Sequence, residues 1–489
     1  MTLTLENFQA LLPLLITGAT AIIVMMAIAI HRNHWWNATV TVIGLNVALL
    51  SSYYAYKVIP QVITPLFVVD GFSIFFSALI LISALGASTL TNAYIESSKR
   101  NREEIYLLIT IATVGGIVLA SAHHMASLFI GLEIMSVALY GMVAYTYDRA
   151  RSLEAAIKYM VLSATASAIM LFGIALIYAQ FGSLEFSAIG SKIGAEPSLL
   201  AVVGGMLMVI GLLFKLSLAP FHLWTPDVYE GSPAPIGAFL ATAAKVGVFA
   251  VLVRFILIES NGVLLSTPFA YTLIAVACIS MLVGNLLALK QNNIKRMLGY
   301  SSIAHFGYLL LLVLVGGKAM AIEGFAIYLT IYVITSLAAF GVVTLMSSAD
   351  ARRDADGLHD YRGLFWRRPF LASIFTLALF SLAGIPLTAG FIGKFYVITA
   401  AVAAGPLACI GLAFVVLGSA IGIYFYLRTI ISLFLAKKHM HRFDAQINWG
   451  QRTGGIMVLG AALFILVIGI VPNPLIDLSK YSLYIWTAQ

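Results

Sequence analysis

Three lysines and one glutamate of this chain lie inside long apolar segments, where an ionised side chain is costly. They are Lys215, Lys245, Lys394 and Glu133. Titratable groups at such depth usually mark an ion path or a proton relay. An amine that is poorly solvated also gives up its proton more readily than an amine in water. These residue types, placed in this way, therefore predict proton transfer inside a membrane.

The composition defines the class of protein that must position these groups. Hydrophobic residues make up 61% of the 489 residues, charged residues only 10%, and the mean hydropathy is +1.00, whereas soluble domains have about 25% charged residues. A membrane-spanning helix needs about 20 apolar residues. By this measure we predict an all-α polytopic membrane protein that forms a single membrane domain over 1–489, with about 14 transmembrane helices centred near residues 19, 46, 81, 113, 135, 168, 210, 245, 278, 308, 335, 385, 420 and 463.

The first apolar segment and the cysteines carry no special signal. Residues 11–30 have no basic stretch before them and are longer than the core of a signal peptide, so we expect a retained span. Cys278 and Cys409 fall inside predicted spans without CxxC or Cys/His spacing. We therefore expect packing roles for both and no metal site.

The basic residues predict the topology. If the loops are counted alternately, nineteen of the 28 lysines and arginines fall on one side of the membrane and five on the side that includes both termini. The positive-inside rule then places both termini on the periplasmic side of a bacterial inner membrane. The net charge of +8 thus reflects orientation and does not indicate a nucleic-acid partner. The four basic residues left over lie within predicted spans and are Lys158, Lys215, Lys245 and Lys394.

Two apolar segments contain interruptions of similar sequence. One holds LSLAP, which ends at Pro220, and the other holds SLAGIP, which ends at Pro386. Proline removes a backbone donor and opens the helical hydrogen-bond ladder, and non-helical backbone at membrane depth must be buried in protein or line a wet cavity. Paired interruptions point to a duplicated element and an ion path. Within the single membrane domain we expect three N-terminal helices over about 1–100, one copy of the duplicated element in each of 101–258 and 265–435, and a C-terminal helix with a short tail at 450–489.

Several of these residues also have structural interpretations. Glu133 needs a companion to remain ionised, and Lys215 is the best candidate on chemistry because each would keep the other charged. Lys245 could instead extend to the membrane interface. For Glu154 and Lys158, an i,i+4 ion pair and a transport role fit equally well. His222 and His305, taken alone, fit buried core histidines better than functional ones.

Three stretches carry a resemblance to a known family. They are FKLSLAPFHLWTPDVYEGSPAPIGAFLATAAKV (214–246), NIKRMLGYSSIAHFGYLLL (293–311) and FSLAGIPLTAGFIGKFYV (380–397). They resemble the antiporter-like membrane subunits of complex I, the proton-pumping NADH-quinone oxidoreductase, and nearly the whole chain resembles its subunit N. Lys394 stands where sibling subunits often carry an acid, and the chain stops soon after its last span. The first two stretches are also similar to those of multisubunit cation/proton antiporters.

The resemblance implies a role for each candidate residue. Glu133 and Lys215 correspond to the family's first ion pair, Lys245 to its central lysine and Lys394 to its terminal group. His222 and His305 match histidines along the family's polar axis, and the fold it implies pairs two inverted five-helix repeats with two broken helices. Loosening the first pair would favour proton release from Lys215 toward Lys245, then past His305 to Lys394 and out.

The resemblance also implies what the chain leaves to its partners. The sequence has no dinucleotide fingerprint, no iron–sulfur cysteine set and no haem motif. FMN, the iron–sulfur clusters and quinone are therefore expected in partner subunits, and the neighbours in the membrane arm include siblings of the same fold. Two alternatives stay open: a subunit of a Mrp-like cation/proton antiporter, and a structural scaffold of the arm. One buried acid offers few oxygen ligands to a hard cation, and a scaffold would be built more cheaply from apolar residues.

Overall fold

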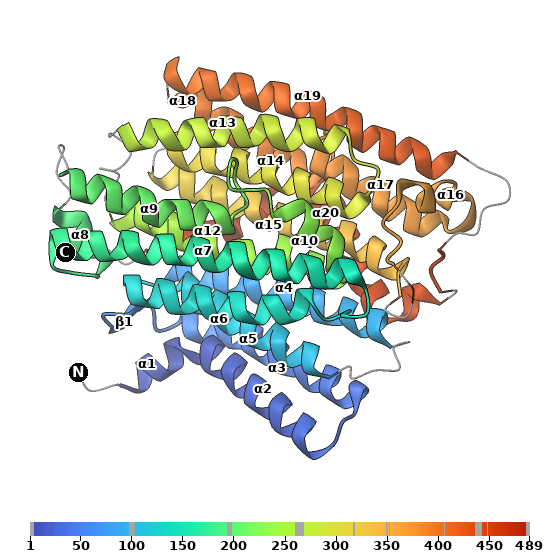
Figure 1. The fold of residues 1–489 in the computed structure, drawn as a ribbon, viewed down its shortest axis with the longest axis horizontal. Helices are drawn as coiled ribbons and strands as arrows, with labels where there is room; N and C mark the ends of the chain where they lie inside the picture. The colour runs from blue at the N-terminus through green and yellow to red at the C-terminus, as the bar shows by residue number, and fades with distance from the viewer. Residues whose placement is uncertain are drawn as a thin grey trace.

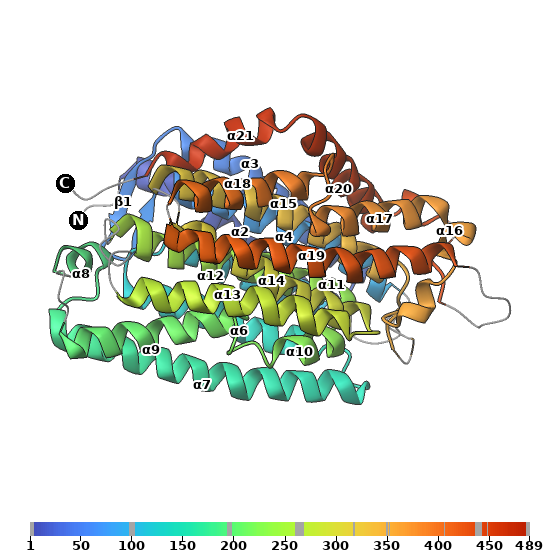
Figure 2. The ribbon, with the colours of Figure 1, turned by 90° about the horizontal axis from the view of Figure 1, so that it is seen from above.

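The computed structural model describes residues 4–96, 103–192, 198–259, 268–315, 318–348, 351, 353–404, 406–435, 443–446 and 448–485. Most of the described residues are helical, and most of the long helices run along the long axis of the molecule (Figures 1 and 2). The basic stretches at 99–102 and 436–442, which contributed to the predicted topology, lie mainly or wholly outside the described residues.

The elements fall into an N-terminal group, two larger sets and a C-terminal group. The N-terminal group is α1 (Leu5–Ala10), α2 (Leu12–Ile30), α3 (His34–Tyr56), the antiparallel hairpin of β1 (Gln61–Thr64) and β2 (Phe67–Val69), and α4 (Gly71–Ile95). The first set is α5 (Glu104–Ala120), α6 (Met125–Val143), α7 (Ala150–Phe181), α8 (Phe186–Lys192), α9 (Leu199–Lys215), α10 (Thr225–Gly231), α11 (Ala234–Ala241), α12 (Ala243–Val253) and η1 (Arg254–Glu259). The second set is α13 (Pro268–Leu289), α14 (Ile294–Val315), α15 (Lys318–Leu345), η3 (Leu358–Tyr361), α16 (Leu364–Arg367), α17 (Pro369–Ala383), α18 (Ala389–Ala403) and α19 (Pro406–Phe434). The C-terminal group is η4 (Trp449–Gln451), α20 (Thr453–Ile470), α21 (Asn473–Ser479) and η5 (Lys480–Leu483).

The helices confirm the predicted class of fold. Within the described residues, 11 helices are long and apolar enough to cross a membrane, and four shorter apolar helices accompany them. Two of the shorter helices, α17 and α18, are the halves of one interrupted segment, so the number of spans agrees with the sequence prediction. The molecule is an all-α polytopic membrane protein. The division into inverted repeats stays a prediction.

Both predicted interruptions are present. Helix α9 ends at Lys215 and α10 begins at Thr225, while Ser217 between them has a φ of 64°. Helix α17 ends at Ala383 and α18 begins at Ala389. Side chains replace part of the lost helical hydrogen bonding, because the Ala219 N–H donates to Ser280 Oγ at 2.9 Å and the Gly390 N–H donates to Ser381 Oγ at 3.0 Å. Non-helical backbone at this depth is thus stabilised by neighbouring helices.

A third interruption lies beside Lys245 and was not predicted. Thr242, with φ −114° and ψ −91°, separates α11 from α12. Its hydroxyl donates to the Ala238 carbonyl at 2.7 Å, a local bond that competes with the helical ladder. The segment has neither proline nor glycine at this point, so no helix-breaking residue marks the interruption in the sequence.

The two ends of the bundle differ in character. Helix α1 contacts β1, and the Gly71 N–H at the end of the hairpin donates to the Tyr484 carbonyl at 2.7 Å, so both described ends of the chain lie at this hairpin end. Helices α10 and α16 lie at the opposite end (Figures 1 and 2). Arg149, Arg296 and Arg353 belong to that opposite end, which we call the basic end. The two termini therefore share one side, as the basic residues predicted.

A fully buried ion pair anchors the helix that carries Lys245. Arg254, immediately after α12, donates to both carboxylate oxygens of Asp70 at 2.8 and 3.0 Å, and both side chains are 0% exposed. Asp70 also caps α4 by accepting the Ser73 N–H at 2.8 Å. Arg254 is one of the five basic residues that were counted on the side of the termini, and its complete burial was not predicted. A bidentate pair of this kind fixes the end of α12 against α4.

We expect Asp70→Asn to destabilise the protein by about 3–5 kcal/mol, because it leaves the buried Arg254 without its counter-charge while retaining an N-cap side chain. The measurement is the fraction of assembled complex that survives heating in detergent. Lys480→Ala, which breaks an exposed pair with Asp477, is the control and should behave as wild type. Equal heat resistance of the two variants would contradict the anchoring role.

Candidate functional site

Lys215 lies at the C-terminal end of α9, surrounded by hydroxyl groups. Its Nζ donates to Ser136 Oγ of α6 at 2.7 Å and to Ser163 Oγ of α7 at 2.5 Å, and the residue is 7% exposed. Tyr140 also donates to Ser163 Oγ, at 2.7 Å. The break after Lys215 places the ammonium group where three helices meet, so hydroxyl oxygens solvate it in place of water.

Glu133 is near Lys215 but does not contact it directly. Its Oε1 accepts a 2.5 Å hydrogen bond from Ser167 on α7, and no ion pair within 4.0 Å joins it to Lys215, both residues being described. Ser163 and Ser167 are one helical turn apart and lie on one face of α7. Two serines therefore separate the acid from the lysine that was predicted as its companion. Glu133 is also partly exposed rather than buried.

Lys245 is the most deeply enclosed of the three lysines. The residue is 1% exposed, and its Nζ donates to Ser302 Oγ of α14. The same nitrogen lies 4.7 Å from the centre of the Phe306 ring and 5.9 Å from that of Tyr229. A hydroxyl oxygen and aromatic faces are its surroundings, and cation–π attraction offsets part of the lost hydration. Burial on this scale excludes extension of Lys245 to the membrane interface.

His305 and Lys394 continue the row within the second set of helices. His305 Nδ1 lies 2.9 Å from the Tyr328 hydroxyl, and its ring packs against Tyr332 at 5.3 Å. Lys394 Nζ donates to the Ala383 carbonyl, left free by the second break, at 2.7 Å, and lies 5.4 Å from the centre of the Tyr308 ring. His305 is close enough to Lys245 and Lys394 to interact electrostatically with both. The structure thus brings these residues together along one interior path.

His222 lies within the first break, after Pro220. It is 7% exposed, and its Nδ1 is buried without a hydrogen-bond partner among the described residues. A satisfied core histidine would have both ring nitrogens paired. His222 also interacts with the Pro220 backbone, so both interpretations of His222 stay predictions.

Glu154 and Lys158 lie outside this row. Lys158 is 43% exposed, and its Nζ contacts Glu154 at 2.6 Å and Asp227 at 2.8 Å. Arg296 in turn contacts Asp227 at 2.7 Å and Glu230 at 2.9 Å. These residues form a chain of alternating charge that connects α7, α10 and α14. The i,i+4 ion pair that was one of the two interpretations of Glu154 and Lys158 is therefore present, and the Lys158 side chain is partly exposed.

Glu323 is an acidic residue within a membrane-spanning helix that the sequence analysis did not name as a candidate. Glu323 lies in the apolar helix α15 and accepts a hydrogen bond from Tyr396 of α18 at 3.1 Å. The statement that Glu133 alone lies inside a span is therefore incorrect. The signal was available, because Glu323 lies inside the apolar run of residues 319–345.

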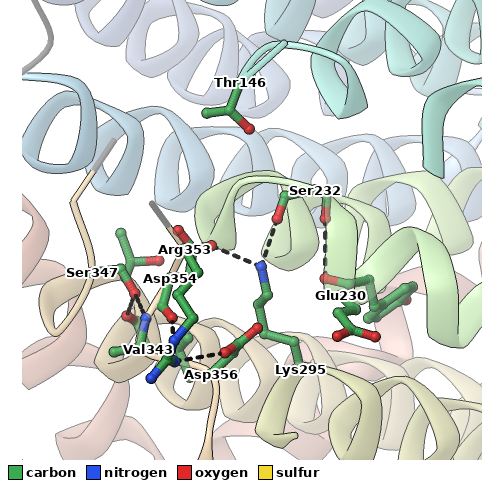
Figure 3. A network of polar contacts seen from close by, with 12 residues as sticks. Thr146, Glu230, Ser232, Lys295, Val343, Ser347, Arg353, Asp354 and Asp356 are labelled. Atoms are coloured by element: carbon green, nitrogen blue, oxygen red, sulfur yellow. Dashed lines mark hydrogen bonds and ion pairs between the residues drawn. The ribbon is translucent and has the colours of Figure 1, made fainter. Parts of the chain in front are cut away.

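A network of buried charged residues around Asp354 and Lys295 lies at the basic end (Figure 3). The Asp354 carboxylate, 0% exposed, accepts from Lys295 Nζ at 2.7 Å, from Arg149 Nη1 at 2.7 Å and from the Tyr94 hydroxyl at 2.6 Å. Burial raises the pKa of Asp354, but Lys295 and Arg149 outweigh it, so the net pKa lies below the ordinary value. Lys295 is one of the nineteen basic residues that were counted on this side, and its burial was not predicted.

A cavity of about 1170 Å³ adjoins this network. Its lining includes Glu230, Gly231, Lys295, Arg149 and Asp354. The C-terminal end of α10 therefore borders a space large enough for many water molecules. This cavity gives the interior row a neighbouring polar region at the basic end.

Comparison with known proteins agrees with this architecture. The family described as "NADH:quinone oxidoreductase/Mrp antiporter, TM" matches residues 122–422. The chain is 54% identical to NADH-quinone oxidoreductase subunit N of Ectopseudomonas mendocina, over 99% of this chain and 98% of that protein. It is 52% identical to the subunit of the same name from Chromohalobacter salexigens, over 98% and 99%.

Solved structures show the same fold. A chain of respiratory complex I from Thermus thermophilus with bound aureothin is 32% identical and superposes with a TM-score of 0.81, over 95% of this chain and 98% of that one. A chain of the Mrp complex from Dietzia sp. DQ12-45-1b has a TM-score of 0.83 at 19% identity, over 98% and 97%, a likeness of fold alone. The breaks, the interior lysines and these relatives lead to one conclusion: the chain belongs to the NADH:quinone oxidoreductase/Mrp antiporter membrane-subunit family, within its subunit N group.

Proposed function

We propose that this chain translocates protons across the membrane as the subunit N component of a NADH-quinone oxidoreductase. The observation that carries the proposal is the row of Lys215, Lys245 and Lys394, all 7% exposed or less. No carboxylate lies within 4.0 Å of any of their Nζ atoms in the described part of the chain. Amines solvated only by hydroxyls, carbonyls and rings are poised to exchange protons when a nearby charge moves.

The Glu133 and Lys215 pair is the proposed point of control. Because Ser163 and Ser167 separate them, a small movement of α6 against α7 changes the distance between the two charges without breaking a direct salt bridge. At an effective dielectric constant near 20, moving a unit charge by a few Å changes the energy of a neighbouring charge by about 1–4 kcal/mol. That change suffices to release the Lys215 proton toward Lys245, and His305 and the Tyr328 hydroxyl then lead to Lys394.

The electron-transfer reaction belongs to partner subunits in this proposal. They hold FMN, the iron–sulfur clusters and quinone, and their signal reaches this chain through the other membrane-arm subunits, siblings of the same fold among them. The site of action is the bacterial inner membrane. We place the hairpin end, with both termini, on the periplasmic side and the basic end on the cytoplasmic side, as the distribution of lysine and arginine requires.

We expect Lys245→Ala to reduce proton pumping and NADH oxidation together, to about a tenth of wild type or less, because a positioned proton-transfer group typically contributes at least that much. Pumping is measured with a pH-sensitive dye in vesicles that contain the assembled complex, while NADH oxidation is followed in parallel. Lys290→Ala, the same change at an exposed lysine, is the control. Unchanged pumping per NADH at unchanged turnover would favour a structural scaffold.

Lys215→Ala should lower pumping and turnover while the complex still assembles. The alanine removes the ammonium group but leaves Ser136 and Ser163 free to hydrogen-bond each other or water, so the packing cost is modest. Assembly is measured by native gel electrophoresis of the solubilised membranes. Full activity with normal pumping in this variant would remove Lys215 from the path.

Replacing all Na⁺ and K⁺ by a large organic cation should leave the rate and extent of pumping unchanged. Within the described residues no group of three His, Cys, Asp or Glu side chains is placed to hold a metal ion, and hard cations need several oxygen ligands. The same vesicle assay in sodium-free and potassium-free buffer makes the measurement. Loss of the pH signal in that buffer, restored by either ion, would favour the cation/proton antiporter alternative.

A further inference from the structure

The hydrogen-bonded groups around Lys215 and Lys245 do not meet. Lys215 binds Ser136 and Ser163, whereas Lys245 binds Ser302, and among the described residues no side chain forms hydrogen bonds with both groups. A proton that moves between the two lysines must therefore cross a stretch that these bonds do not span. The first break, α10 and α11 lie between them in the sequence.

This intervening stretch holds an unusual concentration of unsatisfied polar atoms. Ser217 Oγ, His222 Nδ1, Thr225 Oγ1 and the Tyr229 hydroxyl are buried without a hydrogen-bond partner among the described residues. Each of the four residues is 7% exposed or less. Buried polar atoms are nearly always paired with protein or with ordered water. Four such atoms within thirteen residues indicate a place built to hold water.

Tyr229 is the member of this set that faces Lys245. The centre of its ring lies 5.9 Å from Lys245 Nζ, and Thr225 precedes it by one turn on the same face of α10. Tyr229 interacts with Ser302, the serine that binds Lys245, although not within strict hydrogen-bond geometry, and it is within electrostatic range of Tyr159 and Tyr332. Tyr159 packs on Tyr140, whose hydroxyl bonds Ser163 beside Lys215, and Tyr332 packs on His305. Tyr229 thus lies between the two lysine groups.

Solvent reaches the same helix from the basic end. Glu230 and Gly231, the two residues that follow Tyr229, line the cavity of about 1170 Å³. Lys295, whose Nζ donates to the Ser232 carbonyl at 2.7 Å, lines it as well (Figure 3). The residues that follow Tyr229 in the chain therefore border a space that can hold water, although the Tyr229 side chain itself is buried.

We propose that the Tyr229 and Thr225 hydroxyls bind ordered water and that Tyr229 is a proton-relay residue between Lys215 and Lys245. This inference rests on the proposed function. The Lys215 ammonium loses a proton to the bound water, the water passes a proton to the Tyr229 hydroxyl, and that hydroxyl passes its own proton to the neutral Lys245 amine. One N–H bond breaks and one forms, while the water and Tyr229 end unchanged.

The test is Tyr229→Phe in the assembled complex, a change that removes one oxygen atom and retains the ring. We expect pumping and NADH oxidation to fall about tenfold together, and the slowing of turnover in D₂O to become larger than in wild type, because proton transfer then limits the rate. A density map of the wild-type complex should show ordered water within about 3 Å of the Tyr229 hydroxyl.

Tyr106→Phe is the matched control. Tyr106 on α5 is equally buried, and its hydroxyl also lacks a partner among the described residues, but it contacts none of the three lysines. Both variants should assemble in wild-type amounts, and Tyr106→Phe should pump normally. Normal pumping by Tyr229→Phe while Lys245→Ala fails, or no water at Tyr229, would overturn the relay and leave the proposed function standing. Normal pumping by Lys245→Ala would overturn the proposed function itself.

Discussion

The burial of ammonium groups without carboxylate partners is the constraint on which the arrangement of this protein depends. An ammonium ion in an apolar interior must find polar partners or lose its proton. Lys215 has two serine hydroxyls, Lys245 has Ser302 and two aromatic rings, and Lys394 has a backbone carbonyl and Tyr308. In the proposed function, these partners solvate each charge weakly enough that its protonation responds to a neighbouring charge.

The interruptions of the helices supply much of this solvation. A continuous helix offers no free backbone carbonyl to a side chain, whereas the break after Ala383 leaves one for Lys394. The break after Lys215 opens the space in which Ser217, His222 and Thr225 are buried. Serines from neighbouring helices pair with the freed N–H groups, so the breaks persist at membrane depth. The buried lysines therefore depend on the breaks, which supply polar groups and space around them.

Buried ion pairs lie at both ends of the bundle, on either side of the three interior lysines. The Asp70 and Arg254 pair at one end and the Asp354 network at the other bind their charges in close, multiple contacts. Paired charges of this kind hold helices from both sets in register. These structural charges have partners of opposite sign. In the described part of the chain, the three interior lysines have no carboxylate within ion-pair distance.

Composition and apolar run length by themselves determined the class of fold and the number of spans, the proline motifs the two breaks, and the basic residues that both chain ends share one side. These properties depend on residues close together in the sequence, and the bilayer imposes the same length on every span. The positions of Lys245 and Lys158 were decided only by the tertiary structure. Both lie in apolar runs, yet one is 1% exposed and the other 43%. Which face of a helix is covered depends on its neighbours, and for that reason the serines between Glu133 and Lys215, the break at Thr242 and the burial of Arg254 could not be foreseen from local sequence.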